Sequence, residues 1–251
     1  PRPSSTRSSR PDAHPSMSEP PAHGRVAALV PAAGRGERLG PGAPKALREL
    51  AGTPMLVHAV KALAASPMVD LVVVAAPVQS VEEVRSLLID PEFGAEVTVV
   101  AGGESRSESV ARALIGLPED VDIVLVHDAA RPLVPVEVVT AVASAVREGH
   151  PAVIPVVPVV DTIKSIDDDG RILGTVPRAK LRATQTPQGF DRDVLQRAHA
   201  EVDEAVTDDA GMVESLGITV HAVDGHEESF KVTRPLDVVL AESVIAKRRS
   251  R

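Results

Sequence analysis

The stretch "AALVPAAGRGERLGPGAPKAL", residues 27–47, decides the fold class of this chain. Ala27–Val30 is a short apolar run of the kind that forms a buried strand. The small residues of Pro31–Gly36 let the backbone approach a ligand closely. Arg38 and Lys45 follow, so the turn and its two cations predict a site for a polyanion, most simply a nucleoside triphosphate. The alternative is that the glycines only make a tight turn after a strand.

Beyond this stretch, short apolar runs alternate with helical patterns. The runs predict buried strands at residues 26–30, 71–76, 97–100, 123–126 and 152–157. The helical patterns lie at 54–65, 81–88, 106–115 and 135–147, and later at 191–200, 209–215 and 235–247, with extended segments at 221–223 and 230–232. This alternation predicts an α/β, Rossmann-like domain with a mostly parallel sheet. Ligands of such sheets bind beyond the carboxyl ends of the strands, where residues 31–45 would lie.

The segment "VVPVVDTIKSIDDDGRILGTV", residues 156–176, breaks the alternation. Two extended runs flank the acidic turn Asp167–Gly170, which predicts a protruding β-hairpin arm over about residues 156–178. A hairpin that leaves an α/β domain needs a partner surface, so we expect a homodimer formed through the arm. A lid over the site is the alternative.

Composition excludes several classes of protein. The chain has 251 residues, a net charge of −8 and no long Lys/Arg run in its body, which argues against a nucleic-acid partner. It has no Cys, which excludes disulfides and thiolate metal sites, and no apolar stretch near the ~18 residues of a membrane span. It also has no Trp or Tyr and three Phe, so a bound base cannot stack on Trp or Tyr.

The first part of the chain differs in composition from the rest. Residues 1–23 are rich in Pro, Ser and Arg and lack the apolar core of a secretory signal, so they are predicted to be a disordered tail. Residues 24–251 are predicted to be one domain of a cytoplasmic protein. Met17 is a sensible first residue, and no second synthase domain is expected after the last helix.

Three kinds of nucleotide-binding loop compete for the opening stretch. A dinucleotide fingerprint fails because its third position holds Leu39. A Walker A loop needs Ser or Thr after its Lys, and Lys45 is followed by Ala46. The stretch does resemble the signature of nucleotidylyltransferases, which transfer a nucleotidyl group from a nucleoside triphosphate to a phosphorylated acceptor.

Other motifs supply charged and polar side chains at predicted strand ends. In "VHDAARP", Asp128 can hold Mg²⁺ on a triphosphate and Arg131 can meet an anionic acceptor; a turn residue and a surface salt bridge are the alternatives. In "AGGESRSESV", Gly102, Gly103 and Ser109 can read a base, or the segment can be a helix cap. Lys231 in "FKVTRP" is an isolated cation, and such residues are usually solvated.

The motifs "PAAGRGERLG", "AGGESRSESV", "VHDAARP", "DTIK", "TPQGF", "TDDA" and "FKVTRP" together resemble the 2-C-methyl-D-erythritol 4-phosphate cytidylyltransferase family of the non-mevalonate isoprenoid pathway. They follow one another in the family's order over about Val26–Ile245. The resemblance implies a nucleotidyltransferase α/β domain whose β-arm interlocks a homodimer. One departure is Gly211, which stands where the family more often has Ser.

The resemblance also implies roles for individual residues. It implies catalytic roles for the cations Arg38, Lys45 and Lys231. It implies contacts with CTP for Ala32, Ala33, Gly34, Gly36, Gly103, Glu104 and Ser109. Asp128 would hold the cofactor Mg²⁺. The methylerythritol phosphate acceptor would be bound by Arg131, Thr162, Arg178 and Thr186, with Thr162 and Arg178 acting across the dimer.

The implied reaction is in-line attack of the acceptor phosphate on the α-phosphorus of CTP, with loss of pyrophosphate. The acceptor is already nucleophilic, so catalysis would rest on positioning and on cations that stabilise the developing charge. Two alternatives remain open. One is a cytidylyltransferase for another polyol or sugar phosphate, such as ribitol phosphate. The other is an inactive nucleotide-binding protein, although such a protein would be expected to lose Lys45, Asp128 or Lys231, and all three are present.

Overall fold

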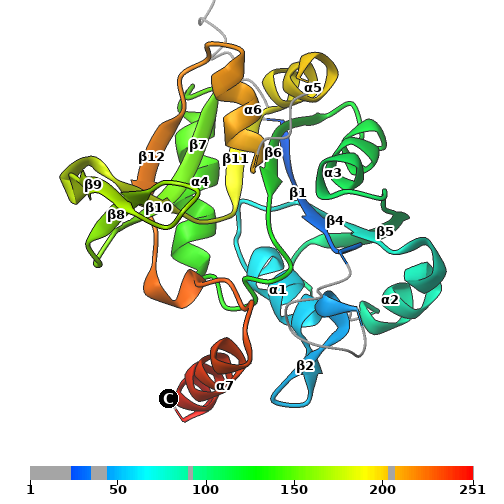
Figure 1. The fold of residues 1–251 in the computed structure, drawn as a ribbon. Coiled ribbons are helices and arrows are strands. Elements are labelled where there is room, and N and C mark those ends of the chain that lie inside the picture. The colour runs from blue at the N-terminus through cyan, green and yellow to red at the C-terminus, as the bar shows by residue number, and fades with distance from the viewer. Residues whose placement is uncertain (1–23, 35–43, 90–92, 203–206, 251) are drawn as a thin grey trace, which may run out of the picture.

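A computed structural model describes residues 24–34, 44–89, 93–202 and 207–250 of the chain (Figure 1). The predicted tail at residues 1–23 and the predicted site residues Gly36 and Arg38 lie outside the described residues. The division into a tail and one domain over residues 24–251 therefore stays a prediction.

Four parallel strands form one half of the central sheet. They are β1 (Arg25–Pro31), β4 (Leu71–Ala76), β5 (Glu96–Ala101) and β6 (Val121–Val126), in the order β6-β1-β4-β5. The β4 sequence LVVVAA is buried throughout because helices cover both faces of a parallel sheet. These strands and β7 confirm the predicted α/β class with a mostly parallel sheet.

The other half of the sheet is built around β7 (Ala152–Pro158). One edge of β7 pairs antiparallel with β10 (Arg182–Thr184) and then β11 (Gln188–Asp191), and the other edge pairs parallel with β12 (His221–Asp224). Thr184 lies opposite Val156, whereas Gly189 lies opposite Val153. The Gln185 amide still donates to the Pro155 carbonyl at 2.8 Å. Four residue steps then lead from Gln185 to Gly189 against two from Pro155 to Val153 on β7, so the chain bulges out of the ladder at Thr186 and Pro187.

Helices cover both faces of the sheet because alternate β1 side chains point to opposite sides. Val26, Ala28 and Val30 pack in one core with α1 (Met55–Ala64), α2 (Val81–Leu87) and α4 (Val136–Arg147). Ala27 and Leu29 pack in the other with α3 (Arg106–Ile115), α5 (Arg192–Glu201) and α6 (Asp209–Ser215). A third core joins α7 (Pro235–Arg249) to Leu50, Met55 and Leu133.

Short elements connect these layers. They are the 3-10 helices η2 (Lys45–Leu47), η3 (Val78–Ser80), η4 (Arg178–Lys180) and η5 (Glu227–Ser229), and the pair β2 (Glu49–Leu50) and β3 (Thr53–Pro54). Residues 230–232, predicted to be extended, form no strand. Among the described residues, no helix combines the length and apolarity needed to cross a bilayer.

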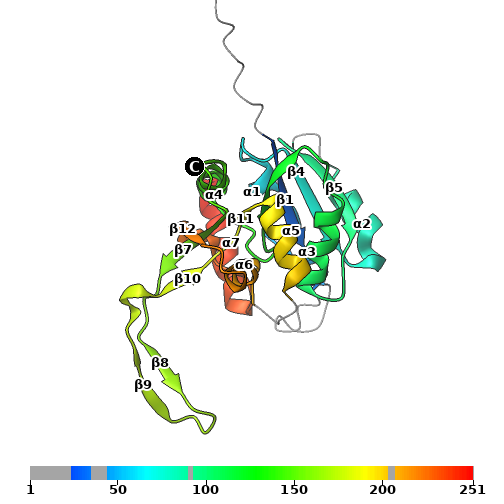
Figure 2. The ribbon, with the colours of Figure 1, turned by 90° about the horizontal axis from the view of Figure 1, so that it is seen from above.

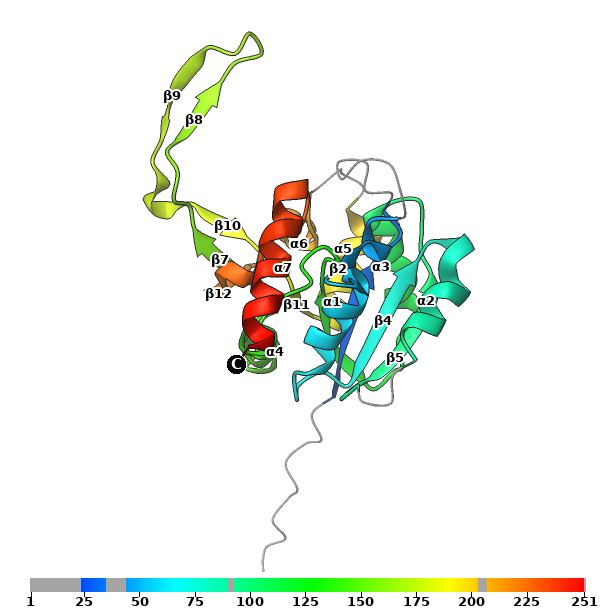
Figure 3. The same cartoon turned by 90° about the horizontal axis from the view of Figure 1, so that it is seen from below.

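The predicted arm is a hairpin of β8 (Ile163–Ile166) and β9 (Ile172–Val176). Figures 2 and 3 show it extending away from the rest of the chain, from the ends of β7 and β10. The prediction began the arm at Val156, which is wrong by several residues. Residues 156–158 belong to β7 and pair with β10 inside the central sheet, so the sheet anchors the base of the arm.

Candidate active site

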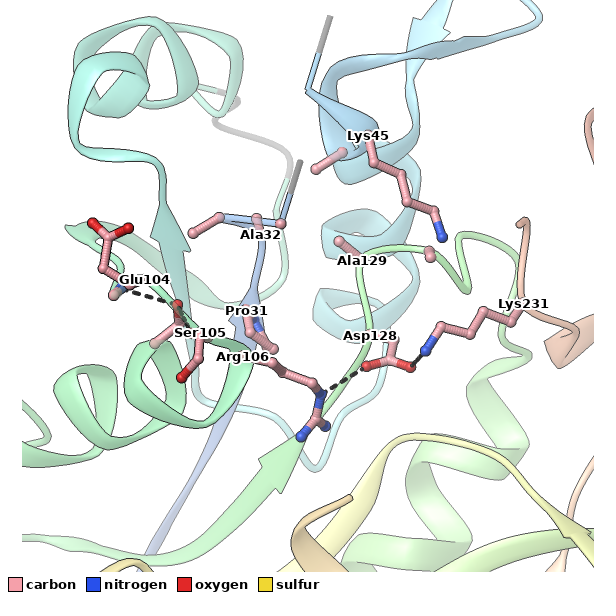
Figure 4. A pocket seen from close by; sticks show the side chains of 15 residues that line it. Pro31, Ala32, Lys45, Glu104, Ser105, Arg106, Asp128, Ala129 and Lys231 are labelled. Atoms are coloured by element: carbon pink, nitrogen blue, oxygen red, sulfur yellow. Dashed lines mark hydrogen bonds and ion pairs between the residues drawn. The ribbon is translucent and has the colours of Figure 1, made fainter. Parts of the chain in front are cut away.

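A cavity of about 250 Å³ opens at the carboxyl ends of the parallel strands (Figure 4). Its walls come from the segments that follow β1, β5 and β6, together with the start of η2 and one residue from the segment before α7. The lining residues are Pro31–Gly34, Lys45, Ala46, Gly103–Arg106, Ser109, Asp128–Ala130 and Lys231. The fold thus brings most of the predicted catalytic and nucleotide-binding residues to one cavity.

The segment after β1 forms the backbone wall of the cavity. The Ala32 amide donates a hydrogen bond to the Ala75 carbonyl at 2.9 Å, which fixes the start of the turn on β4. Gly34 is exposed, and a side chain there would meet no atom of the described residues within 4 Å, so they leave this backbone open to a ligand. The structure therefore leaves room beside residues 32–34 for a group larger than a water molecule.

The segment after β5 is packed closely against the first turn of α3. A Cβ at Gly102 would lie 2.9 Å from the Ala33 side chain, and one at Gly103 would lie 2.4 Å from Glu108 Cγ. Ser109 Oγ accepts from the Gly103 amide at 3.0 Å and donates to the Ser105 carbonyl at 2.8 Å. Both glycines are needed for this close approach, and the Ser109 hydroxyl holds the loop in shape.

Asp128 follows β6 and is the electrostatic centre of the cavity. Its Oδ2 lies 2.7 Å from Lys231 Nζ, and its Oδ1 accepts from Arg106 Nε at 3.2 Å. Burial alone would raise the pKa of the Asp128 carboxyl. Arg106 and Lys231, with Arg131 behind them, outweigh burial and hold that pKa well below its usual value. The carboxylate is therefore ionised over the whole physiological pH range.

Lys45 enters the same space from the start of η2. Figure 4 shows its side chain extending toward the Asp128–Lys231 pair. Lys45 and Lys231 are far apart in sequence, yet both line the cavity. Two ammonium groups beside an open backbone turn form a surface suited to a phosphate chain.

Behind Asp128, a hydrogen-bonded chain fixes the segment after β6. The Asp128 amide donates to Thr186 Oγ1 at 3.0 Å, and that hydroxyl lies 3.1 Å from His127 Nδ1. His127 Nε2 lies 3.0 Å from the Arg131 carbonyl, which can only accept, so Nε2 carries the hydrogen and Nδ1 accepts from Thr186. Burial lowers the pKa of His127 to about 4, so the ring is neutral near pH 7.

The four predicted acceptor residues fall into two groups. Thr186 is buried against Asp128, and Arg131 donates to the Ser229 carbonyl at 2.7 Å and the Thr184 carbonyl at 3.2 Å. Thr162 and Arg178 are exposed at the base of the arm, where Arg178 donates to the Val160 carbonyl. None of the four lines the cavity, although Arg131 and Thr186 contact Asp128, which does.

Sequence reasoning missed a second buried group of charges beside the cavity. Arg106 Nη1 donates to Asp209 Oδ2 at 2.7 Å, and Asp209 Oδ1 lies 3.0 Å from His199 Nε2. Arg106 and Asp209 both stand inside motifs quoted above, "AGGESRSESV" and "TDDA". A charged residue at the start of a predicted helix was the available signal, although their pairing across 103 positions was not visible in the sequence.

Comparisons with known proteins agree on one family. The family model described as IspD, 2-C-methyl-D-erythritol 4-phosphate cytidylyltransferase, matches residues 26–247. A protein of that name from Streptomyces avermitilis is 60% identical over 238 residues, covering 91% of this chain and 95% of its own length. One from Streptomyces coelicolor is 61% identical over 234 residues, covering 90% and 86%.

Solved structures agree in fold. The crystal structure of 2-C-methyl-D-erythritol 4-phosphate cytidylyltransferase from Thermus thermophilus matches with a TM-score of 0.70 and 35% identity, covering 88% of this chain and 98% of that one. A synthase structure from Anaerococcus prevotii, at 24% identity and a TM-score of 0.78 over 89% and 97% of the two chains, supports the fold alone.

Proposed function

Because the chain belongs to the 2-C-methyl-D-erythritol 4-phosphate cytidylyltransferase family, we propose that its cavity transfers a cytidylyl group from CTP to 2-C-methyl-D-erythritol 4-phosphate. A phosphate oxygen of the acceptor forms a bond to the α-phosphorus of CTP. The bond from that phosphorus to the oxygen of the β-phosphate breaks, and its electron pair leaves with pyrophosphate. The products are 4-diphosphocytidyl-2-C-methyl-D-erythritol and pyrophosphate.

The observation that carries this proposal is the meeting of Lys45, Asp128 and Lys231 beside the open turn at residues 32–34. The reaction brings two anions together and moves charge onto the leaving pyrophosphate. Preorganised cations lower that barrier because they are already oriented when the charge develops. Lys45 and Lys231 supply such cations here, and Arg38 is assigned the same role from the sequence.

The nucleotide half of the site follows from the backbone walls. Ala32, Ala33 and Gly34, continued by Gly36, are proposed to bind the phosphates through backbone amides. Gly103, Glu104 and Ser109 are proposed to face the cytidine. For Ser109 the contact would use the remaining lone pair of a hydroxyl that already makes two hydrogen bonds within the loop.

A divalent cation, which we propose to be Mg²⁺, belongs to the same mechanism. Among the described residues, no group of three or more His, Cys, Asp or Glu side chains could hold a metal. Mg²⁺ is commonly bound by one or two carboxylates together with substrate phosphates. Asp128, ionised and placed at the cavity, fits an ion that arrives with CTP, and such an ion would neutralise triphosphate charge.

The acceptor half of the site is proposed to need two chains. Arg131 and Thr186 do not line the cavity, but both adjoin Asp128, which does, so we propose that they contribute to the acceptor side of the site. Thr162 and Arg178 lie at the base of the arm and do not line the cavity of their own chain. The arm extends away from the rest of the chain (Figure 2), so we propose that they reach the cavity of a second copy in a homodimer. We propose a cytoplasmic location because CTP is available there, and no nucleic-acid or membrane partner.

Pyrophosphate release by the purified protein tests this proposal. CTP, UTP, ATP and GTP are each paired with methylerythritol phosphate and with ribitol phosphate, with a Lys45→Ala preparation measuring contaminating activity. We expect CTP with methylerythritol phosphate to give the highest kcat/KM. A higher kcat/KM with ribitol phosphate would show that ribitol phosphate, rather than methylerythritol phosphate, is the preferred acceptor. No pyrophosphate release with any pair would overturn the proposed transfer.

A further inference from the structure

Arg106 stands in an electrostatically unfavourable place. It is the first residue of α3, where the helix dipole repels a cation. Two carboxylates offset that repulsion: Asp128 Oδ1 lies 3.2 Å from Arg106 Nε, and Asp209 Oδ2 lies 2.7 Å from Nη1. Arg106 therefore bridges the segment after β6 to the start of α6, and its direction depends on both partners.

Both carboxylate oxygens of Asp209 are engaged by buried or half-buried side chains. Its side chain is 1% exposed, and His199 on α5, itself 6% exposed, lies 3.0 Å from the oxygen that Arg106 does not use. Gln188 of β11 accepts from the Ala210 amide at 3.1 Å and donates to Asp208 at 2.7 Å, which ties the first turn of α6 to the sheet. Reorienting a buried carboxylate with both oxygens engaged costs free energy, because a buried ion pair or hydrogen bond would have to break.

The bond to Asp209 determines how Arg106 pairs with the two oxygens of the Asp128 carboxylate. Arg and a lone carboxylate favour a two-pronged pairing that uses both oxygens. Arg106 gives Nη1 to Asp209 and Nε to Asp128 Oδ1, which fixes the guanidinium plane between the two carboxylates, and Asp128 Oδ2 stays with Lys231 Nζ at 2.7 Å. Without the bond to Asp209, the guanidinium could turn until Nε and Nη2 both face the Asp128 carboxylate, in competition with Lys231.

We propose that Asp209 and His199 are positioning residues for the cytidylyl transfer, which through Arg106 hold the Asp128 carboxylate with one oxygen facing Lys231. Arg106 lines the cavity, whereas Asp209 and His199 do not. Their effect on the reaction must therefore pass through Arg106 and Asp128. This inference rests on the proposed function for its kinetic consequences, but its geometry does not.

A double-mutant cycle between Asp209→Asn and Asp128→Asn tests the proposal. Asp209→Asn should lower kcat roughly tenfold, the scale of a lost charge-assisted hydrogen bond acting at one remove. In the Asp128→Asn background the same change should alter kcat by less than about twofold, because the group it positions is gone. If the two substitutions lower kcat by factors that multiply in the double variant, as a general loss of stability would, the proposal is overturned. An unchanged kcat in Asp209→Asn would also overturn it.

Asp193→Asn is the matched control, because it removes an exposed carboxylate on the helix that carries His199. It should leave kcat and the melting temperature unchanged. If Asp209→Asn does not fold, His199→Leu replaces it in the cycle. His199→Gln, whose amide can still donate to Asp209, should restore at least half of the kcat that His199→Leu loses, and failure to do so would contradict the role of His199.

A binding readout separates this inference from the proposed function. Calorimetric titration with CTP and Mg²⁺ needs no turnover. We expect Asp209→Asn to weaken CTP binding several-fold when Asp128 is present and to have no effect when it is Asn. Absence of cytidylyl transfer in the unaltered protein would overturn the proposed function, whereas equal CTP affinities in all four proteins of the cycle would overturn the positioning role.

Discussion

Asp128 touches three cations of its own chain, whereas Arg178 and Thr162 on the arm face solvent. The cavity is built from segments joined by buried hydrogen bonds, and its charges are set before any ligand arrives. The arm is a two-stranded hairpin, and Ile166, Ile172 and Leu173 are each more than half exposed on it. Isolated two-stranded hairpins are marginally stable in water, which supports the proposal that the arm packs on a second copy of the chain.

The difference separates two kinds of functional residue. Residues around Asp128 are oriented by contacts inside one chain, so changes there should act on chemistry or on folding. Residues on the arm are largely exposed in their own chain, so changes there should act on acceptor binding through the proposed second copy. The predictions below test that separation.

Removal of divalent cations should have the largest effect. Excess chelator should abolish turnover, because the triphosphate charge would be unneutralised. Asp128→Asn should raise the Mg²⁺ concentration needed for half-maximal rate. Asp167→Asn, on the turn of the arm, is the control and should leave the Mg²⁺ requirement unchanged; full activity in excess chelator would remove the metal from the mechanism.

Lys45→Ala should lower kcat by ~10²–10³, the scale of losing one transition-state donor. The melting temperature should hold within a few degrees, since Lys45 is only partly buried. Steady-state kinetics and thermal unfolding measure the two effects. Lys247→Ala, in the last turn of α7, is the control cation. Near-normal turnover in pure Lys45→Ala protein would exclude Lys45 from catalysis.

His127 should make the stability of the fold depend on pH. Its folded pKa is about 4, below the ordinary 6.5, so the unfolded chain binds a proton first as the pH falls. The free energy of unfolding should therefore decrease between about pH 6.5 and 4, by about 3 kcal/mol from this residue. Denaturant titrations of the unaltered protein and of His127→Gln at several pH values measure the contribution of His127 to the free energy of unfolding.

The Gln amide stays neutral and can still donate to the Arg131 carbonyl. Acidic groups shared by both proteins cancel in the comparison. Parallel curves of stability against pH for the two proteins would show that His127 does not titrate as a buried neutral ring.

Arg178→Ala should have the smallest effect, and it should be confined to one substrate. Loss of a charge-assisted phosphate contact should raise the acceptor KM by roughly one to two orders of magnitude, with the KM for CTP little changed. Lys180→Ala, two residues along the same turn, is the control for charge alone. An equal rise in both KM values would argue against a separate acceptor role for the arm.

Mixing Arg178→Ala chains with Lys45→Ala chains decides whether the arm acts in trans. In a heterodimer, one cavity would contain both an intact Lys45 and an intact Arg178 from the partner. Activity should then recover above that of either parent. No recovery, in a mixture shown by native mass spectrometry to contain heterodimers, would mean that each arm serves its own chain.

Much of the fold and half of the site could be predicted because the signals are local. Runs such as LVVVAA at 71–76 report burial on both faces, and motif residues directly after such runs must lie at the carboxyl edge of the sheet. Asp128, Gly103 and Ala32 were placed at the cavity in this way. The start of the arm was misplaced because residues 156–158 are extended both in β7 and in a hairpin.

The sequence by itself determined most of the strands and helices, and it predicted an anion site at the edge of the sheet where the structure has a cavity. Apolar periodicity and the small residues of a turn are properties of neighbouring positions. The tertiary structure alone decided that Arg106 pairs with Asp209, that Thr186 supports Asp128, and that Arg131 binds two carbonyls. The sequence does not show which distant residue a charged side chain will pair with, because the packing of the sheet and helices sets which ionic groups come within hydrogen-bond distance.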